Sequence, residues 1–143
     1  MPSAKIFIVE DNPSDIFLLR RCLQDHESEF ELEIAHDGEA ALEFVARQRA
    51  AQHNPRPCVA LLDLHLPKCD GLEVLHALCQ SPPLSHVRVV MMSTSASPRE
   101  QAEIRKMGAE FRLKPGELSE FSELAAHLIA ICRASFRATT MAG

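Results

Sequence analysis

Hydrophobic residues fall into short runs along the chain, separated by stretches that have helical spacing. Three runs are almost wholly apolar and rich in β-branched residues: residues 5–9, 58–62 and 87–92. Runs of this length, bounded by Pro, Gly, Asp or Ser, are typical of parallel strands that are covered on both faces of a sheet. Two further segments, residues 31–35 and 109–113, alternate polar and apolar positions, which indicates strands at the edges of the sheet.

Each predicted strand is followed by a segment with the period of a helix. The first four of these segments open at a polar capping residue next to Pro or Gly: Asn12-Pro13, Asp37-Gly38, Asp70-Gly71 and Ser97-Pro98. The last helix is expected over residues 117–131. Its inward-facing side chains are predicted to be Phe121, Leu124, Leu128 and Ile131.

Strand and helix alternate five times, which predicts a doubly wound α/β domain with a parallel sheet. A chain of 143 residues has the length of one domain. We expect that domain over residues 1–135, with a short frayed tail over residues 136–143. The longest irregular segment is predicted at residues 52–57.

Composition and charge exclude several classes of protein. With 46% hydrophobic and 24% charged residues, the chain has the composition of a globular domain. It has no apolar stretch near the roughly 18–20 residues that a membrane span needs, and it does not begin with a signal peptide. We therefore expect a cytoplasmic protein with no membrane partner. The formal net charge of −5, with scattered basic residues, argues against a nucleic-acid partner.

The cysteines and histidines do not suggest a metal site. The cysteines are odd in number and lack Cys-x-x-Cys spacing, and most lie in apolar segments. They are predicted to be reduced thiols rather than disulfides or zinc ligands. These residues are Cys22, Cys58, Cys69, Cys79 and Cys132.

Polar residues follow four of the predicted strands. Glu10 and Asp11 follow the first strand, Asp63 the third, Ser93 the fourth and Lys114 the fifth. In an open parallel sheet, ligands bind outside the carboxyl ends of the strands. We therefore expect three carboxylates, a hydroxyl group and an ammonium group to meet at one edge of the sheet.

Three carboxylates in one place repel one another, so either some of them become protonated or a cation neutralises them. Mg²⁺ suits them, because it binds a few carboxylate or carbonyl oxygens and keeps positions open that can accept a phosphoryl group. Lys114 and Ser93 would then bind the phosphoryl oxygens. Asp63 follows the most apolar strand, at the expected centre of the sheet, and is the candidate nucleophile that would form an aspartyl phosphate.

Together these motifs resemble the receiver domain of bacterial two-component response regulators. The residues that carry the resemblance are Glu10-Asp11, Asp63, Leu66-Pro67, Asp70-Gly71, the hydroxyl residue after Met92, and Lys114-Pro115. The resemblance covers about residues 5–131 and implies a flavodoxin-like (βα)5 fold with five parallel strands in the order 2-1-3-4-5. The length of a single domain and the segment at residues 52–57 are similar to those of the small receivers that accompany phytochrome-type kinases.

The resemblance implies the metal ligands and the phosphoryl donor. Asp63 would accept a phosphoryl group from a sensor histidine kinase or a phosphotransfer protein. Asp11, Asp63 and the backbone carbonyl of His65 would bind Mg²⁺ directly, and Glu10 would act through water. Glu10 stands where the family more often has Asp.

The resemblance also implies a conformational switch. Ser93, where the family more often has Thr, would move toward the phosphoryl group, and either Thr94 or Ser95 could share the donor role. Phe111 would turn inward as the switch aromatic, and Lys114 would contact the phosphoryl oxygens. The peptide bond between Lys114 and Pro115 is expected to be cis.

We therefore expect a stand-alone phosphoacceptor protein rather than an enzyme, which signals to an unknown target through protein contacts. A homodimer would form through the fourth helix, the fifth strand and the last helix. One alternative is a receiver-like binding module that works without phosphorylation. Another is a metal-dependent phosphatase of the haloacid dehalogenase type, but such enzymes need an Asp where His65 stands.

Overall fold

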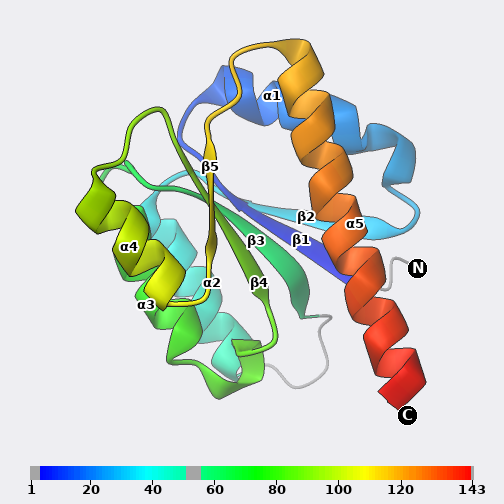
Figure 1. Ribbon diagram of the computed structural model, residues 1–143. Coiled ribbons are helices and arrows are strands. Elements are labelled where there is room, and N and C mark those ends of the chain that lie inside the picture. The colour runs from blue at the N-terminus through cyan, green and yellow to red at the C-terminus, as the bar shows by residue number, and fades with distance from the viewer. Residues whose placement is uncertain (1–3, 51–55, 143) are drawn as a thin grey trace.

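The computed structural model describes residues 4–50 and 56–142, with side chains up to residue 135. The strands of this part are β1 (Ala4–Val9), β2 (Phe30–Ala35), β3 (Pro57–Asp63), β4 (Arg88–Ser93) and β5 (Glu110–Leu113) (Figure 1). The helices are α1 (Pro13–Leu23), α2 (Gly38–Ala50), α3 (Gly71–Cys79), α4 (Pro98–Lys106) and α5 (Leu118–Ala142). Two short 3-10 turns, η1 (Gln24–His26) and η2 (Pro82–Leu84), follow α1 and α3.

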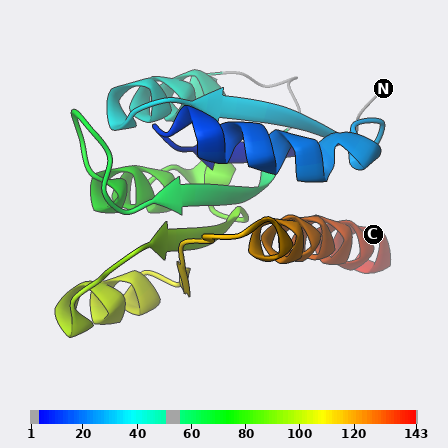
Figure 2. The same ribbon diagram turned by 90° about the horizontal axis from the view of Figure 1, so that it is seen from above.

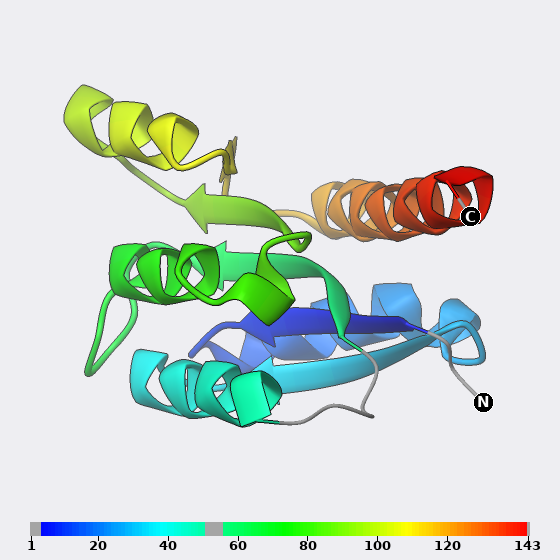
Figure 3. The same cartoon turned by 90° about the horizontal axis from the view of Figure 1, so that it is seen from below.

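The five strands form one parallel sheet in the order β2-β1-β3-β4-β5, which confirms the predicted fold. Figures 2 and 3 show α2, α3 and α4 stacked along one face of this sheet and α1 and α5 along the other. Each face has its own apolar cluster, one formed with α1 and α5 and the other with the remaining three helices. The molecule is therefore a three-layer α/β/α sandwich.

Burial along the strands follows their place in the sheet. Every residue of β1 and β3 is buried, whereas β2 and β5 are only partly covered. The alternating segments were therefore correctly predicted as edge strands. Phe7 of β1 stacks on Phe44 of α2 with ring centroids 4.1 Å apart, which anchors α2 to the centre of the sheet.

The predicted helix starts are also confirmed by their caps. The side chain of Asn12 accepts hydrogen bonds from the backbone amides of Ser14 and Asp15, ahead of α1. Ser97 and Glu100 form a reciprocal capping box at the start of α4. These caps fix where α1 and α4 leave the carboxyl edge of the sheet.

The end of the last helix differs from the prediction. α5 continues to Ala142, so residues 136–142, expected to be a frayed tail, are helical. The reason is that no Pro or Gly follows Ile131 until Gly143, and most of the intervening residues are compatible with a helix. The domain boundary at residue 135 stays a prediction. Most of the irregular segment predicted at residues 52–57 lies outside the described residues.

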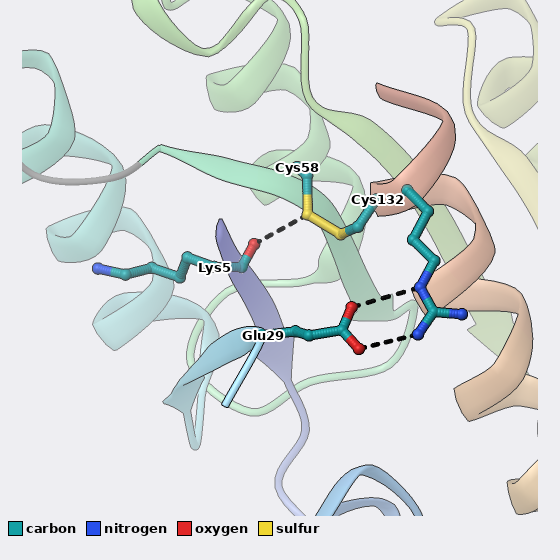
Figure 4. The surroundings of a disulfide bond; sticks show 5 residues. Lys5, Glu29, Cys58 and Cys132 are labelled. Carbon is teal, nitrogen blue, oxygen red and sulfur yellow. Dashed lines mark hydrogen bonds and ion pairs between the residues drawn. A yellow bond between two sulfur atoms is a disulfide. The ribbon is translucent and has the colours of Figure 1, made fainter. Parts of the chain in front are cut away.

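The expectation of reduced cysteines was wrong for one pair. Cys58 of β3 and Cys132 of α5 form a disulfide, with Cα atoms 5.2 Å apart (Figure 4). Cysteine number and sequence spacing do not reveal such a pair, because the two residues are 74 positions apart and meet only where α5 packs on β3. Cys22, Cys69 and Cys79 are free thiols.

None of the described helices, α5 included, combines the length and the apolar character that crossing a bilayer requires.

Candidate metal and phosphoacceptor site

The strand ends bring the predicted site residues to one edge of the sheet. Glu10 follows β1, Asp63 is the last residue of β3, Ser93 is the last residue of β4, and Lys114 follows β5. The backbone amide of Lys114 donates to the carbonyl oxygen of Ser93 at 2.9 Å, which joins the ends of β4 and β5. Residues about fifty positions apart in the sequence thus face one another, as the parallel topology predicts.

The three predicted carboxylates form one cluster. Carboxylate oxygens of Glu10, Asp11 and Asp63 all lie within 4.8 Å of one another. Glu10 is fully buried and Asp63 is 4% exposed, while Asp11 faces solvent. The expected convergence of the acidic groups is therefore confirmed, and the cluster has one side open to solvent.

Lys114 lies among these carboxylates. Its Nζ is 2.6 Å from Glu10 Oε1 and donates a hydrogen bond to Asp63 Oδ2 at 2.9 Å. Burial alone would lower the pKa of Lys114, but the hydrogen bonds to Glu10 and Asp63 outweigh it and raise that pKa. The ammonium group is therefore charged at any physiological pH and partly neutralises the cluster.

Sequence reasoning missed a fourth carboxylate, that of Asp15. Its Oδ2 lies 3.2 Å from Lys114 Nζ, and its side chain is 17% exposed. Asp15 stands in the first turn of α1, where an acidic residue is ordinarily explained by the helix dipole. The available signal was that α1 starts at the same sheet edge as Glu10 and Asp11, which places its first turn beside the cluster.

The electrostatics of Glu10 provide a test of whether the site fits a cation. Burial raises the pKa of Glu10 to about 9, with a further increase from Asp63, although Lys114 acts in the opposite direction. Neither oxygen of Glu10 has a hydrogen-bond partner of normal geometry, although Oε1 lies 2.6 Å from Lys114 Nζ. A buried acid with an unpartnered oxygen, beside two more carboxylates, is a donor set that suits a hard divalent cation such as Mg²⁺.

The loop after β3 holds Asp63 in place. The backbone amide of His65 donates to Asp63 Oδ1 at 3.0 Å, and the amide of Gly71 donates to the carbonyl oxygen of Leu64 at 2.9 Å. A Cβ at Gly71 would overlap the carbonyl oxygen of Asp63, so α3 can approach this closely only with glycine there. The loop thereby fixes the direction of the carboxylate, and the role of the His65 carbonyl as a ligand stays a prediction.

The Ser93 hydroxyl group is hydrogen-bonded within its own loop. Its Oγ donates to the carbonyl oxygen of Ser95 at 2.5 Å and accepts from the Ser95 amide at 3.1 Å. The ring of His65 lies 3.2 Å from the same carbonyl oxygen through Nε2. Thr94 is exposed, and Phe111 is half-buried against the α2–α4 side of the sheet. The switch roles of Ser93, Thr94 and Phe111 stay predictions.

The expected cis peptide at Lys114 and Pro115 is not found. The described residues contain no cis peptide bond, so this bond is trans. The trans isomer is the lower in energy even before proline. Lys114 reaches Glu10 and Asp63 with the bond in this form.

Comparison with known proteins agrees with the geometry of the site. Residues 6–125 match the family described as the response regulator receiver domain. Response regulator Rcp1 of Synechocystis sp. is 42% identical over 94 residues, which cover 66% of this chain and 64% of Rcp1. The polar-differentiation response regulator DivK of Brucella anthropi is 32% identical over 124 residues, which cover 86% of this chain and 93% of DivK. Both relatives are response regulators by name.

Solved structures show the same fold at similar identity. The Mn²⁺-bound form of response regulator Rcp1 has a TM-score of 0.74 and 32% identity, covering 85% of this chain and 88% of that one. The phosphorylated cyanobacterial phytochrome response regulator RcpA has a TM-score of 0.74, 33% identity and the same coverages of 85% and 88%. The bacteriophytochrome response regulator AtBRR has a TM-score of 0.67 and 32% identity, covering 92% and 95%. The chain therefore belongs to the family of response regulator receiver domains.

Proposed function

We propose that this protein is a phosphoacceptor switch. Asp63 takes a phosphoryl group from a sensor histidine kinase or a phosphotransfer protein, in a reaction that depends on Mg²⁺, and a partner protein recognises the changed surface. The observation that carries this proposal is the meeting of Glu10, Asp11 and Asp63 with Lys114 at one sheet edge. The similarity to phytochrome response regulators supports a phytochrome-type kinase as the donor and the cytoplasm as the location.

The metal would be held by the carboxylates of Asp11 and Asp63 and the backbone carbonyl of His65, with Glu10 contributing through water. When bound, Mg²⁺ supplies positive charge that offsets the carboxylates and the phosphoryl oxygens. Response regulator Rcp1 has been solved in a Mn²⁺-bound form, which supports the binding of a divalent cation by this chain. The solvent-facing side chain of Asp11 leaves room for water and for the phosphoryl donor.

Asp63 is the nucleophile of the proposed reaction. One of its carboxylate oxygens attacks phosphorus, and the bond from phosphorus to the donor imidazole nitrogen breaks, so the imidazole leaves. Lys114 Nζ, already 2.9 Å from Asp63 Oδ2, is placed to transfer a hydrogen bond to the phosphoryl oxygens. Ser93 would reach them only after its Oγ gives up the carbonyl oxygen of Ser95.

Output would follow from the added charge. A phosphoryl group brings about −1.5 to −2 charges at neutral pH by analogy with other phosphorylated side chains, and it favours the conformation in which Ser93 and Lys114 point toward it. Leu113 at the end of β5 and Leu118 at the start of α5 are 72% and 57% exposed. Such exposed apolar side chains support a protein partner, or a second copy of the chain, on the α4-β5-α5 face.

The proposal is tested by incubating the full chain with Mg²⁺ and phosphoramidate or acetyl phosphate, then measuring the intact mass. We expect one phosphoryl group on the wild type and on Asp25→Asn, whose side chain is exposed and remote from the cluster, and none on Asp63→Asn or without Mg²⁺. Mg²⁺ binding with no adduct would refute the phosphoacceptor function in favour of a phosphorylation-independent module. Sustained turnover of small phosphate esters would favour a phosphatase.

A further inference from the structure

We propose that Cys58 and Cys132 form a redox-sensitive clamp that fastens the middle of α5 to the start of β3. The clamp lies at the amino end of β3, whereas the acidic cluster lies at its carboxyl end. The proposal therefore does not rest on the phosphoacceptor function. It assigns to this chain a site of reversible thiol oxidation, whose reactants are dithiols in one direction and small disulfides in the other.

The backbone separation and the burial of Cys58 and Cys132 are those of a disulfide inside the fold. The Cα atoms of Cys58 and Cys132 are 5.2 Å apart, inside the range that disulfides require. Cys58 is 6% exposed and Cys132 is fully buried. Both lie in the apolar cluster between the sheet and α5, together with Val59 and Leu128. The packing of α5 on β3 therefore holds the two sulfur atoms together in either redox state.

The fold can also accommodate the reduced form, in which Cys58 and Cys132 are thiols. Cys58 Sγ lies 3.4 Å from the carbonyl oxygen of Lys5 on the neighbouring strand β1 (Figure 4). A thiol at Cys58 can donate a hydrogen bond to that oxygen, and a thiol at Cys132 would lie in the apolar cluster, where a cysteine packs as a small hydrophobic side chain. The fold therefore accommodates the reduced pair as well as the disulfide.

Next to the disulfide, α5 has a second attachment that does not depend on redox state. Arg133 forms two contacts with Glu29, from Nη2 to Oε1 at 2.9 Å and from Nε to Oε2 at 3.3 Å (Figure 4). Both side chains are nearly half exposed, so this ion pair is screened by water and holds α5 weakly. Beyond Arg133 the helix continues to Ala142. Breaking the disulfide therefore removes the covalent attachment of this part of α5 and leaves the apolar packing and the weak ion pair.

The chemistry balances with a dithiol as reductant. A thiolate of the dithiol attacks one sulfur of the pair, the other sulfur leaves as a thiolate, and the second thiol of the reagent resolves the mixed disulfide. The protein gains two protons and two electrons, and the dithiol becomes a disulfide. Glutathione disulfide oxidises the pair in the opposite sense and releases two molecules of glutathione, and two molecules of glutathione can likewise take the place of the dithiol as reductant. In a reducing compartment the pair rests as thiols, so the clamp would close when the compartment becomes oxidising.

The experiment compares the full chain equilibrated in reduced and in oxidised glutathione. Differential alkylation and peptide mapping identify the bonded cysteines, and hydrogen exchange reports the opening of α5. We expect a Cys58–Cys132 bridge in the oxidised sample, and exchange over residues 128–142 about tenfold faster in the reduced sample, with β1 unchanged. Cys79→Ser, which alters an exposed free thiol, should behave as the wild type.

The wild type is compared with itself, so the result does not depend on how well a variant folds. Cys58→Ser and Cys132→Ser should each show the faster exchange under both conditions. The proposal is overturned if glutathione disulfide leaves both thiols free for alkylation after prolonged equilibration. Equal exchange of α5 in the bridged and reduced forms would also overturn it, because the bond would then constrain nothing.

Discussion

Replacing Glu10 by Gln should stabilise the metal-free protein at neutral pH. Burial raises the pKa of Glu10 from its ordinary 4.5 to about 9 in the folded protein. Below pH 4.5 both the folded and the unfolded forms carry a protonated Glu10, so its contribution to stability is complete there. As the pH rises from 4.5 to 9 the unfolded form ionises while the folded form does not, and stability is lost.

The size of the effect follows from the pKa difference. Each pH unit inside this window costs about 1.4 kcal/mol. Because pH 7 lies about 2.5 units above the ordinary pKa, the wild type loses about 3 kcal/mol there, and Glu10→Gln avoids that loss. Lys114, whose pKa is raised, stays protonated in both forms and adds no slope. For a domain of this size the difference corresponds to roughly 6–12 °C in Tm.

The assay is thermal or urea unfolding in EDTA at pH 5.5, 7 and 8.5. The wild type should lose stability more steeply with pH than Glu10→Gln, so the two curves diverge. Glu31→Gln, an exposed change on β2, should follow the wild type. Added Mg²⁺ should stabilise the wild type more than Glu10→Gln at pH 8.5. Parallel pH profiles for the wild type and Glu10→Gln would contradict this prediction, because Glu10 would then ionise over the same pH range in the folded and unfolded forms.

Three further perturbations test other contacts. Asp15→Asn removes a carboxylate that lies 3.2 Å from Lys114 Nζ. It should weaken Mg²⁺ binding several-fold in calorimetry, while Asp63 is still phosphorylated. Unchanged Mg²⁺ affinity would exclude Asp15 from the site. Gly71→Ala should lower the free energy of unfolding in urea by about 1–3 kcal/mol and slow the phosphorylation of Asp63. The reason is that the added Cβ would overlap the carbonyl oxygen of Asp63. Wild-type values for both quantities would show that α3 shifts freely. Reducing the Cys58–Cys132 disulfide, which spans 74 positions, should lower stability by about 4 kcal/mol on the chain-entropy estimate, and a loss near zero would contradict it.

The fold and the main site residues were predictable because they depend on local patterns and one topological rule. Buried strands such as β3 read as apolar runs, and a parallel sheet brings their carboxyl ends to one edge. Asp63 and Lys114 could therefore be paired from sequence, although they are 51 residues apart. The pairing of Asp63 with Lys114 follows from the strand order alone and does not depend on any side-chain contact.

What the sequence did not reveal depends on how helices pack on the sheet. Asp15 reaches Lys114 only through the orientation of the first turn of α1, and the same acid would be expected there for the helix dipole alone. Cys132 meets Cys58 because of how α5 lies across β3, which no spacing encodes. The orientation of Ser93 is set by a 2.5 Å hydrogen bond to Ser95 within its own loop, and a rotamer of this kind leaves no trace in a residue pattern.

The two sites constrain α5 at different points along its length. Lys114 precedes the start of α5 at Leu118 by a short connection, and Cys132 holds the same helix further along its length. Asp63 and Cys58 lie at opposite ends of β3, roughly 17 Å apart at the usual rise per residue of a strand. Because β3 is buried and hydrogen-bonded to strands on both sides, it is a poor candidate for carrying a displacement between them. Any coupling between phosphorylation and oxidation should therefore pass through α5, whose position both sites constrain.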